Sequence, residues 1–396
     1  MAFIPQSVFA DRGKRIQTWL NEQDYQALIV TTPLNFYMVT GFHLDVEPWE
    51  RPVAAVFPRG AKPFLVMNEL STNHLKFAEE RRTLLVTDYT IYQEHYTNAN
   101  RTWTRDQFGD ILATRLGDLG ITRGTIAVEG GPHHLMRIAM PHVQWADATR
   151  YLVQMREVKY PEELAIMRDA AKLTDWGQDK YMEILKPGAK VKAFDLHVAS
   201  LMMEEGAKRF PNDRVEVRLW SSGGKWSSAP HGSGAEAAEA FEVGTGVVNI
   251  IIVRLNGLVV ENERTLFVGK PKSDIQVRAF EASTDACEAA AAQMIAGNPV
   301  SSADAAATAV YDKAGFAQYI NHRTGHGLGI GGHEFPEDMP FNHRPFKENE
   351  VYSSEPGIYI YGVGGFRHDD TVIVGAKKPE VITHRSKKLD DQIVPV

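Results

Sequence analysis

The sequence is poor in cysteine, in long apolar runs and in net positive charge. Its single cysteine, Cys287, excludes an internal disulfide and favours a reducing compartment. No apolar run approaches the roughly 20 residues that span a bilayer, and the first residues lack the basic-then-apolar order of a secretory signal. A net charge of −7 argues against polyanionic partners such as nucleic acid. We therefore expect a cytoplasmic protein with neither a membrane nor a nucleic-acid partner.

The composition is that of an ordinary globular protein, because 43% of the residues are apolar and 23% are charged. A chain of 396 residues is long enough for two domains with separate cores. Early in the chain, short apolar runs alternate with helical patterns, which predicts an α/β domain. The expected strands there are Ala27–Val30, Val53–Phe57, Phe64–Met67, Leu84–Val86 and Thr125–Val128. A boundary near Tyr151–Pro161 predicts an N-terminal domain of residues 1–155 and a second domain of residues 156–396.

The second domain is expected to be built around the stretch Val247–Gly269. Two β-branched apolar runs meet there at Asn256-Gly257, which is the strongest short-range signal for a two-residue hairpin turn. The register that this turn predicts places Ile250 opposite Glu263 and Ile252 opposite Glu261. Two carboxylates on one face of an apolar hairpin are costly unless something binds them. The alternative is an edge hairpin whose acidic face is hydrated.

Further polar residues occur in glycine-rich or strand-like stretches. They are His231 in WSSGGKWSSAPHGSG, His326 and His333 in GHGLGIGGHE, Glu355 in YSSEPGIYIY, and Asp369 in GGFRHDDTVIV. Each one alone has an ordinary interpretation, because a histidine in a loop is usually exposed and Glu-Pro-Gly is a common turn. In the first domain, Trp49-Glu50-Arg51-Pro52 places an aromatic ring beside a guanidinium that could hold a carboxylate. The alternative there is a locally buried tryptophan beside a hydrated surface arginine.

In this order and combination, the motifs resemble the pita-bread superfamily, which includes methionine aminopeptidase, aminopeptidase P, prolidase and creatinase. The resemblance covers nearly the whole chain, and its details resemble creatinase most. It implies an α/β N-terminal domain followed by an α+β pita-bread catalytic domain. It also implies a hydrolase that acts on a C–N bond.

The metallopeptidase members of the superfamily carry five metal ligands, and the resemblance places these at Ile250, Glu261, His326, Glu355 and Asp369. Isoleucine cannot bind a metal, so the usual two-metal site loses a carboxylate. The other four residues could still hold one Mn, Fe or Zn ion. Because the first ligand is missing and two others differ in length from the family pattern, we expect no metal cofactor, with one divalent metal as the alternative.

The metal-independent creatinase branch resembles this chain at Glu263-Arg264-Thr265-Leu266-Phe267 and at Trp49-Glu50-Arg51-Pro52. This resemblance implies that His231 shuttles the proton, that Glu263 and Glu355 hold a cationic group of the substrate, and that Arg51 holds its carboxylate. The expected catalytic residues are therefore His231, Glu263, Glu355 and His326. The expected substrate-binding residues are Arg51, Trp49, Glu261, His333, Glu337 and Asp369.

Three functions remain open on this basis. The main expectation is a creatinase-like hydrolase of a small guanidino, amidino or cyclic amidine compound. Where creatinase has a second carboxylate-binding arginine this chain has Pro336-Glu337, so ectoine, the substrate of the related ectoine hydrolase, is the leading specific guess rather than creatine. The first alternative is a metal-dependent Xaa-Pro-type aminopeptidase or dipeptidase with a reduced metal site. The second is a catalytically inactive pita-bread protein that binds a partner.

The resemblance also implies a homodimer with active sites shared between the subunits, because Arg51 lies in the domain that is remote from the other expected catalytic residues. Inactive Arg51→Ala and inactive His231→Ala subunits should therefore recover part of the wild-type activity when they are combined. The measurement is substrate hydrolysis by heterodimers whose composition has been verified. Verified heterodimers that recover no activity would contradict a shared site.

Overall fold

The structure is a computed structural model that describes residues 3–44, 50–95, 106–231, 236–334 and 339–396. The chain divides into two compact units, one formed by Ile4–Met155 and the other mainly by Arg156–Val396. The first unit has an α/β arrangement and the second an α+β arrangement, as expected from the sequence.

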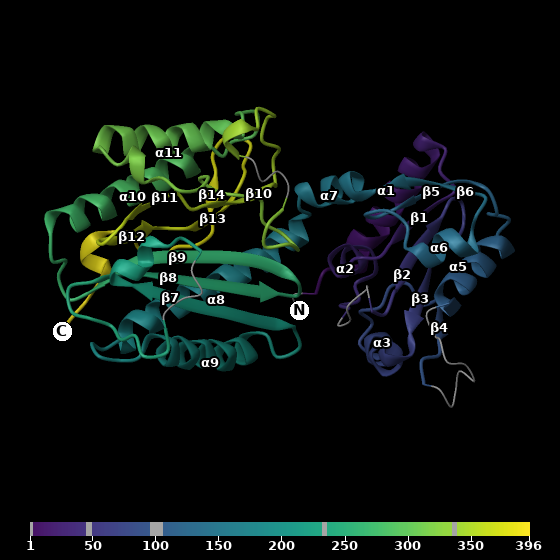
Figure 1. The fold of residues 1–396 in the computed structure, drawn as a ribbon, viewed down its shortest axis with the longest axis horizontal. Coiled ribbons are helices and arrows are strands. Elements are labelled where there is room, and N and C mark those ends of the chain that lie inside the picture. The colour runs from purple at the N-terminus through teal and green to yellow at the C-terminus, as the bar shows by residue number, and fades with distance from the viewer. Residues whose placement is uncertain (1–2, 45–49, 96–105, 232–235, 335–338) are drawn as a thin grey trace. The chain divides into compact units, whose positions relative to one another are not determined.

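The N-terminal unit is a mixed six-stranded sheet with helices (Figure 1). Its strand order is β4-β3-β2-β1-β5-β6, and the β1–β2 and β2–β3 pairs are antiparallel while the other pairs are parallel. The strands are β1 (Ala27–Val30), β2 (Ala54–Pro58), β3 (Phe64–Asn68), β4 (Tyr89–Tyr92), β5 (Gly124–Val128) and β6 (Val143–Asp147). The helices are α1 (Gln6–Gln23), α2 (Pro33–Thr40), α3 (Thr72–Glu80), α5 (Asp106–Asp118), α6 (His134–Ala139) and α7 (Thr149–Glu157).

One expected strand of this unit is wrong. Leu84 and Val86 are buried, as their apolar character suggests, but Leu84–Val86 forms no strand. The amide of Leu85 donates instead to the carbonyl of Thr40, which lies outside the sheet. The sheet gains its fourth strand a few residues later, at β4.

The second unit places its strands between two groups of helices (Figure 1). Helices α8 and α9 contact β7, β8 and β9, whereas α10 contacts the short strands β10 to β13. The helices are α8 (Pro161–Ile184), α9 (Val191–Arg209), α10 (Asp274–Gln293) and α11 (Ser301–Ala314). The strands are β7 (Val215–Gly223), β8 (Gly246–Leu255), β9 (Leu258–Val268), β10 (Val351–Ser354), β11 (Gly357–Ile360), β12 (Gly364–Arg367), β13 (Asp370–Ile373), β14 (Glu380–Val381) and β15 (Ile393–Val394). They form three sheets, ordered β15-β9-β8-β7, β10-β13-β14 and β11-β12.

The predicted hairpin is confirmed as β8 and β9. Asn256 and Gly257 have φ values of 47° and 85°, so both turn residues adopt the left-handed conformation that such a tight hairpin requires. The Asn256 side chain fixes the turn further, because it accepts a hydrogen bond from the Arg214 amide and donates one to Asp213. The register pairs Ile250 with Glu263 and Ile252 with Glu261, as predicted.

No helix among the described residues is both long and apolar enough to cross a membrane. Cys287 is buried on α10 and is not part of a disulfide. The cytoplasmic location expected from the sequence stays a prediction.

The opposite face of the hairpin is held by a buried polar network beneath α8 and α9. Asn249 donates to the Ser221 hydroxyl at 3.0 Å, and Asp195 accepts from the Ser221 amide and hydroxyl at 2.8 Å each. The Tyr181 hydroxyl donates to Asp195 at 3.0 Å. Burial raises the pKa of Asp195 to about 6, although these hydrogen bonds favour its ionised form. Asn249 therefore points away from the face that carries Ile250, because successive side chains of a regular strand alternate between its faces.

The raised pKa of Asp195 predicts a pH-dependent stability. A carboxyl whose folded pKa exceeds its unfolded value stabilises the fold when it is protonated, and this stabilisation is lost as the pH rises from about 4 through about 6. Over that range, the wild type should lose up to about 3 kcal/mol of unfolding free energy relative to Asp195→Asn. Urea denaturation of both proteins at several pH values measures the difference. A constant difference would show that Asp195 has an ordinary pKa.

Candidate active site

One face of β7, β8 and β9 forms a wall of a cavity of about 490 Å³. Six of the side chains that we expected to act together line this cavity: His231, Glu261, Glu263, His326, His333 and Glu355. The carboxylate of Asp369 lies beside them, within 4.8 Å of carboxylate oxygens of Glu263 and Glu355. The structure thus gathers residues from five separate stretches of the chain at one cavity.

The other expected residues have different outcomes. Arg51 belongs to the N-terminal unit, where it forms ion pairs with Glu50 at 2.6 Å and with Glu94 at 2.9 Å. Trp49 and Glu337 lie outside the described residues. Their roles in substrate binding stay predictions.

The strand register explains why the cavity residues meet. Residues directly opposite one another in antiparallel strands have side chains on the same face of the sheet. One row across the sheet contains Trp220, Ile250 and Glu263, and the next row contains Arg218, Ile252 and Glu261. The backbone of Glu263 also pairs with that of Asp369, which extends the first row by one residue.

His326 lies between the carboxylates of Glu261 and Glu355. Its Nε2 atom lies 3.1 Å from Glu355 Oε1 and 3.5 Å from Glu261 Oε2, and its ring stacks on His333 with centroids 3.8 Å apart. Burial lowers the pKa of His326, but the hydrogen bond and charge of Glu355 outweigh it and raise the pKa to about 9. Burial raises the pKa of Glu261 to about 8. This group can therefore both donate and accept a proton near neutral pH.

Glu263 is paired with a buried arginine. Arg367 Nη2 donates to Glu263 Oε1 at 3.0 Å, and Arg367 Nε contacts the other oxygen. The same guanidinium donates to the Tyr359 hydroxyl at 3.1 Å, so its position is fixed from two sides. Burial raises the pKa of Glu263 to about 7, because the charge of Arg367 only partly offsets the loss of solvent.

His231 lies on the exposed wall of the cavity, just after the short helical turn Gly224–Ser228. Its ring centroid is 6.2 Å from that of His322. His322 Nε2 lies 2.7 Å from the hydroxyl of Tyr359, which connects this edge of the site to Arg367. An exposed imidazole at the entrance of the cavity is accessible to both substrate and water.

Comparison with known proteins assigns the chain to a family. Residues 165–376, more than half of the chain, match the model of metallopeptidase family M24. Residues 12–158 match the Creatinase/Prolidase N-terminal domain. The chain belongs to metallopeptidase family M24. The predicted pita-bread fold and its creatinase-type N-terminal domain are thereby confirmed.

Relatives of similar length carry peptidase names. The chain is 26% identical to the putative dipeptidase YkvY of Bacillus subtilis over 384 residues, which covers 96% of this chain and 99% of that protein. It is 24% identical to an Xaa-Pro dipeptidase of Lactobacillus helveticus over 388 residues, covering 96% and 98%. Dipeptidase PepE of Mycobacterium ulcerans superposes with a TM-score of 0.81 at 26% identity, covering 99% of this chain and 100% of that one.

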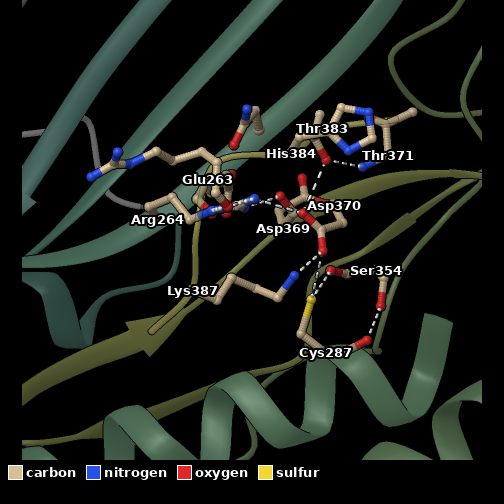
Figure 2. Close-up of polar contacts among 12 residues, drawn as sticks. Glu263, Arg264, Cys287, Ser354, Asp369, Asp370, Thr371, Thr383, His384 and Lys387 are labelled. Carbon is tan, nitrogen blue, oxygen red and sulfur yellow. Dashed lines mark hydrogen bonds and ion pairs between the residues drawn. The ribbon is translucent and has the colours of Figure 1, made fainter. Parts of the chain in front are cut away.

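Two neighbouring aspartates of this M24 chain have opposite environments (Figure 2). Asp370 is ion-paired with Arg264 at 2.8 Å and with Lys387 at 2.6 Å, and it accepts a hydrogen bond from Thr383. These cations outweigh burial and hold the pKa of Asp370 well below its usual range. Asp369 is fully buried, and neither carboxylate oxygen has a hydrogen-bond partner. Burial and the nearby glutamates raise its pKa.

The expectation of no metal cofactor is wrong. The chain belongs to a metallopeptidase family, and Glu263, Glu355 and Asp369 form a buried group whose carboxylate oxygens lie within 4.8 Å of one another. A buried carboxylate without a partner, such as Asp369, is costly unless a cation binds it. Within the described part of the chain, this is the group that could hold a metal. Ile250 offers no ligand atom, but Glu263 of this group is its direct partner on the adjacent strand, and Glu263 pairs with Asp369.

The creatinase-like function, with ectoine as the guessed substrate, is also contradicted. Relatives that match over almost their full length include proteins named dipeptidase and Xaa-Pro dipeptidase. The motif Glu263-Arg264-Thr265-Leu266-Phe267, which suggested creatinase, is compatible with a peptidase, because Glu263 lies in the group that could hold a metal. The chain is a hydrolase that acts on C–N bonds, as expected.

Three cavity residues were missed from the sequence: Arg367, Arg218 and Trp220. Arg367 lies in the stretch GGFRHDDTVIV, from which only Asp369 was predicted as a site residue. Arg218 and Trp220 are spaced by two residues on β7, so the alternation of a strand could have placed them on one face. Which face meets the cavity depends on the pairing of β7 with β8, which no turn motif marks.

The buried pair of Glu263 and Arg367 predicts a specific loss of stability. Arg367→Met leaves Glu263 buried without its cation, which typically costs about 3–5 kcal/mol of unfolding free energy. The loss should be larger at about pH 8.5 than at about pH 5.5, because Glu263 can take up a proton at the lower pH. The double variant Arg367→Met/Glu263→Gln should be more stable than Arg367→Met. Denaturation of the metal-free proteins measures this, and equal stability of the single and double variants would contradict it.

Proposed function

We propose that this chain is a metal-dependent dipeptidase that cleaves dipeptides of the Xaa-Pro type. The names of its relatives support the reaction and the substrate class. The observation that carries the proposal is the buried group of Glu263, Glu355 and Asp369 at the wall of a cavity. A site of this kind fits metal-assisted hydrolysis, because carboxylate oxygens are suitable ligands for ions such as Mn²⁺.

The charges around the cavity suit a short peptide with free ends. The acidic group lies at β9, and Arg218 lies two strands away on β7, in the row that ends at Glu261. The Arg218 guanidinium lies over the Trp220 ring, 4.2 Å from its centroid. No carboxylate of the described residues forms an ion pair with it, so Arg218 is available to hold the substrate's terminal carboxylate. The carboxylates would then face the amino end.

The chain's own residues supply the remaining roles. When bound at the carboxylates around Glu355 and Asp369, a divalent ion supplies Lewis-acid chemistry for the scissile carbonyl. The imidazole of His326, beside Glu355 and Glu261, holds a proton close to the reacting groups. His231, at the exposed wall, delivers a proton to the leaving nitrogen. Arg367 orients Glu263 through its fixed ion pair.

The homodimer with shared active sites belongs to the same proposal. Arg51 would act on the substrate of the partner subunit after leaving its ion pairs with Glu50 and Glu94. These ion pairs are partly exposed, so replacing the carboxylates of Glu50 and Glu94 by a carboxylate of the substrate should cost little free energy.

Metal removal is the direct test of the proposed function. Exhaustive dialysis against a chelator should lower the hydrolysis of Xaa-Pro dipeptides by about 100-fold or more, since Lewis-acid catalysis typically supplies several kcal/mol. Adding Mn²⁺, Zn²⁺ or Fe²⁺ one at a time should restore it. The rate of proline release is the measurement.

Two controls sharpen this test. Xaa-Pro dipeptides with a blocked amino group or an amidated carboxyl end should be hydrolysed much more slowly, because both free ends are proposed to be bound. Full activity in protein shown by elemental analysis to be free of metal would contradict the proposal. Absence of any dipeptide hydrolysis by the metal-loaded protein would contradict it as well.

A further inference from the structure

The neighbours of Ile250 across the sheet include two acidic residues. Ile250 on β8 stands where the resemblance places the family's first metal ligand, and its direct partner on β9 is Glu263. The backbone of Glu263 pairs in turn with that of Asp369. Side chains at directly opposite positions of antiparallel strands have Cβ atoms about 4.5–5.5 Å apart. A carboxylate is therefore absent at one position of the row and present at the next.

We propose that Glu263 replaces the missing aspartate as a metal ligand, so that Glu263, Glu355 and Asp369 bind one divalent cation per chain. The ligand has moved across the hairpin from β8 to β9. Oxygens of the three carboxylates lie within 4.8 Å of one another, and all three side chains are buried. This inference rests on the metal requirement of the proposed function and assigns its ligands and its stoichiometry.

Asp369 provides an independent indication of a bound cation. Its side chain is 0% exposed and neither oxygen has a hydrogen-bond partner. Cationic side chains are present nearby, because the adjacent Asp370 forms ion pairs with Arg264 and Lys387 (Figure 2). The backbone pairing with Glu263 directs Asp369 to the acidic group instead.

The charges of the site fit one divalent ion. Four carboxylates, those of Glu261, Glu263, Glu355 and Asp369, face one guanidinium and one imidazole. The guanidinium of Arg367 pairs with Glu263 alone at hydrogen-bond distance, so the carboxylates of Glu355 and Asp369 remain for a cation. Each carboxylate oxygen has two lone pairs, so Glu263 can bind a metal while it keeps Arg367.

A second ion would meet unfavourable surroundings. The guanidinium of Arg367 already occupies one side of Glu263, and its Nη1 atom lies 4.0 Å from Glu355 Oε2, so it takes the place that a second cation would need. Ile250 offers no ligand atom on the other side of Glu263. Glu261, which is the family's second position, faces His326 in the neighbouring row rather than the group of three.

Metal binding to the metal-free protein tests this assignment without any assay of activity. Titration calorimetry with Mn²⁺ should give one site per wild-type chain. Glu263→Gln should weaken binding at least tenfold more than Glu261→Gln, which is the matched control on the same strand and face. Removing a residue that hydrogen-bonds to a metal ligand typically lowers metal affinity about 10–100-fold. Removing the ligand itself in Glu263→Gln should therefore lower the Mn²⁺ affinity by more than about 100-fold.

A rescue variant separates a ligand from a merely structural residue. Adding Ile250→Asp to Glu263→Gln returns a carboxylate to the family's position, and it should recover much of the affinity. If Glu263→Gln does not fold, Glu263→Asp replaces it, and the visible spectrum of bound Co²⁺ should differ from that of the wild type.

The outcomes distinguish this inference from the proposed function. Wild-type affinity in Glu263→Gln, or an unchanged Co²⁺ spectrum in Glu263→Asp, would show that Glu263 is not a ligand. Two ions per wild-type chain would contradict the stoichiometry. Both results leave a metal-dependent enzyme standing, whereas a wild-type protein that binds no divalent ion would overturn the proposed function itself.

Discussion

The site depends on the register of the hairpin formed by β8 and β9. Asn256 and Gly257 adopt left-handed backbone conformations that close the turn in two residues, and this fixes every cross-strand pair that follows. A slip by one residue would send Glu261 and Glu263 to the opposite face. That face carries the network in which Asn249 donates to Ser221 and Ser221 donates to Asp195. Further carboxylates there would add buried charge without a cation.

A second constraint is the balance of buried charge. The second unit places several carboxyl groups out of contact with water, and it matches only some of them with cations. Asp370 is satisfied by Arg264 and Lys387, and Glu263 by Arg367. Asp195 lacks a cation but accepts hydrogen bonds from Ser221 and Tyr181, whereas the Asp369 carboxylate has neither an ion pair nor a hydrogen-bond partner among the described residues. Such an imbalance is costly in an isolated chain, so it is consistent with a site that is completed by a bound ion.

The correction of the metal prediction has a specific physical cause. Considered along β8 alone, Ile250 is simply a position without a metal ligand. In the folded sheet, the nearest neighbours of Ile250 are on the adjacent strands, and one of them is Glu263. Ile250 and Glu263 are cross-strand partners, as the turn at Asn256-Gly257 predicts, so the acidic residue lies directly beside the position that lacks a ligand atom.

The sequence by itself determined the elements whose signals are local. The turn at Asn256-Gly257 fixed the hairpin and its pairs, alternating strands and helices fixed the first unit, and the ordered motifs fixed the family. It misplaced a strand at Leu84–Val86, because burial of apolar residues does not require a strand. Only the tertiary structure decided that Glu263 and Asp369 pair, that Arg367 holds Glu263, and that Arg218 and Trp220 enter the cavity. These contacts join residues that are distant in the chain or belong to strands linked by long connections, and no local preference of the backbone encodes which of them will meet.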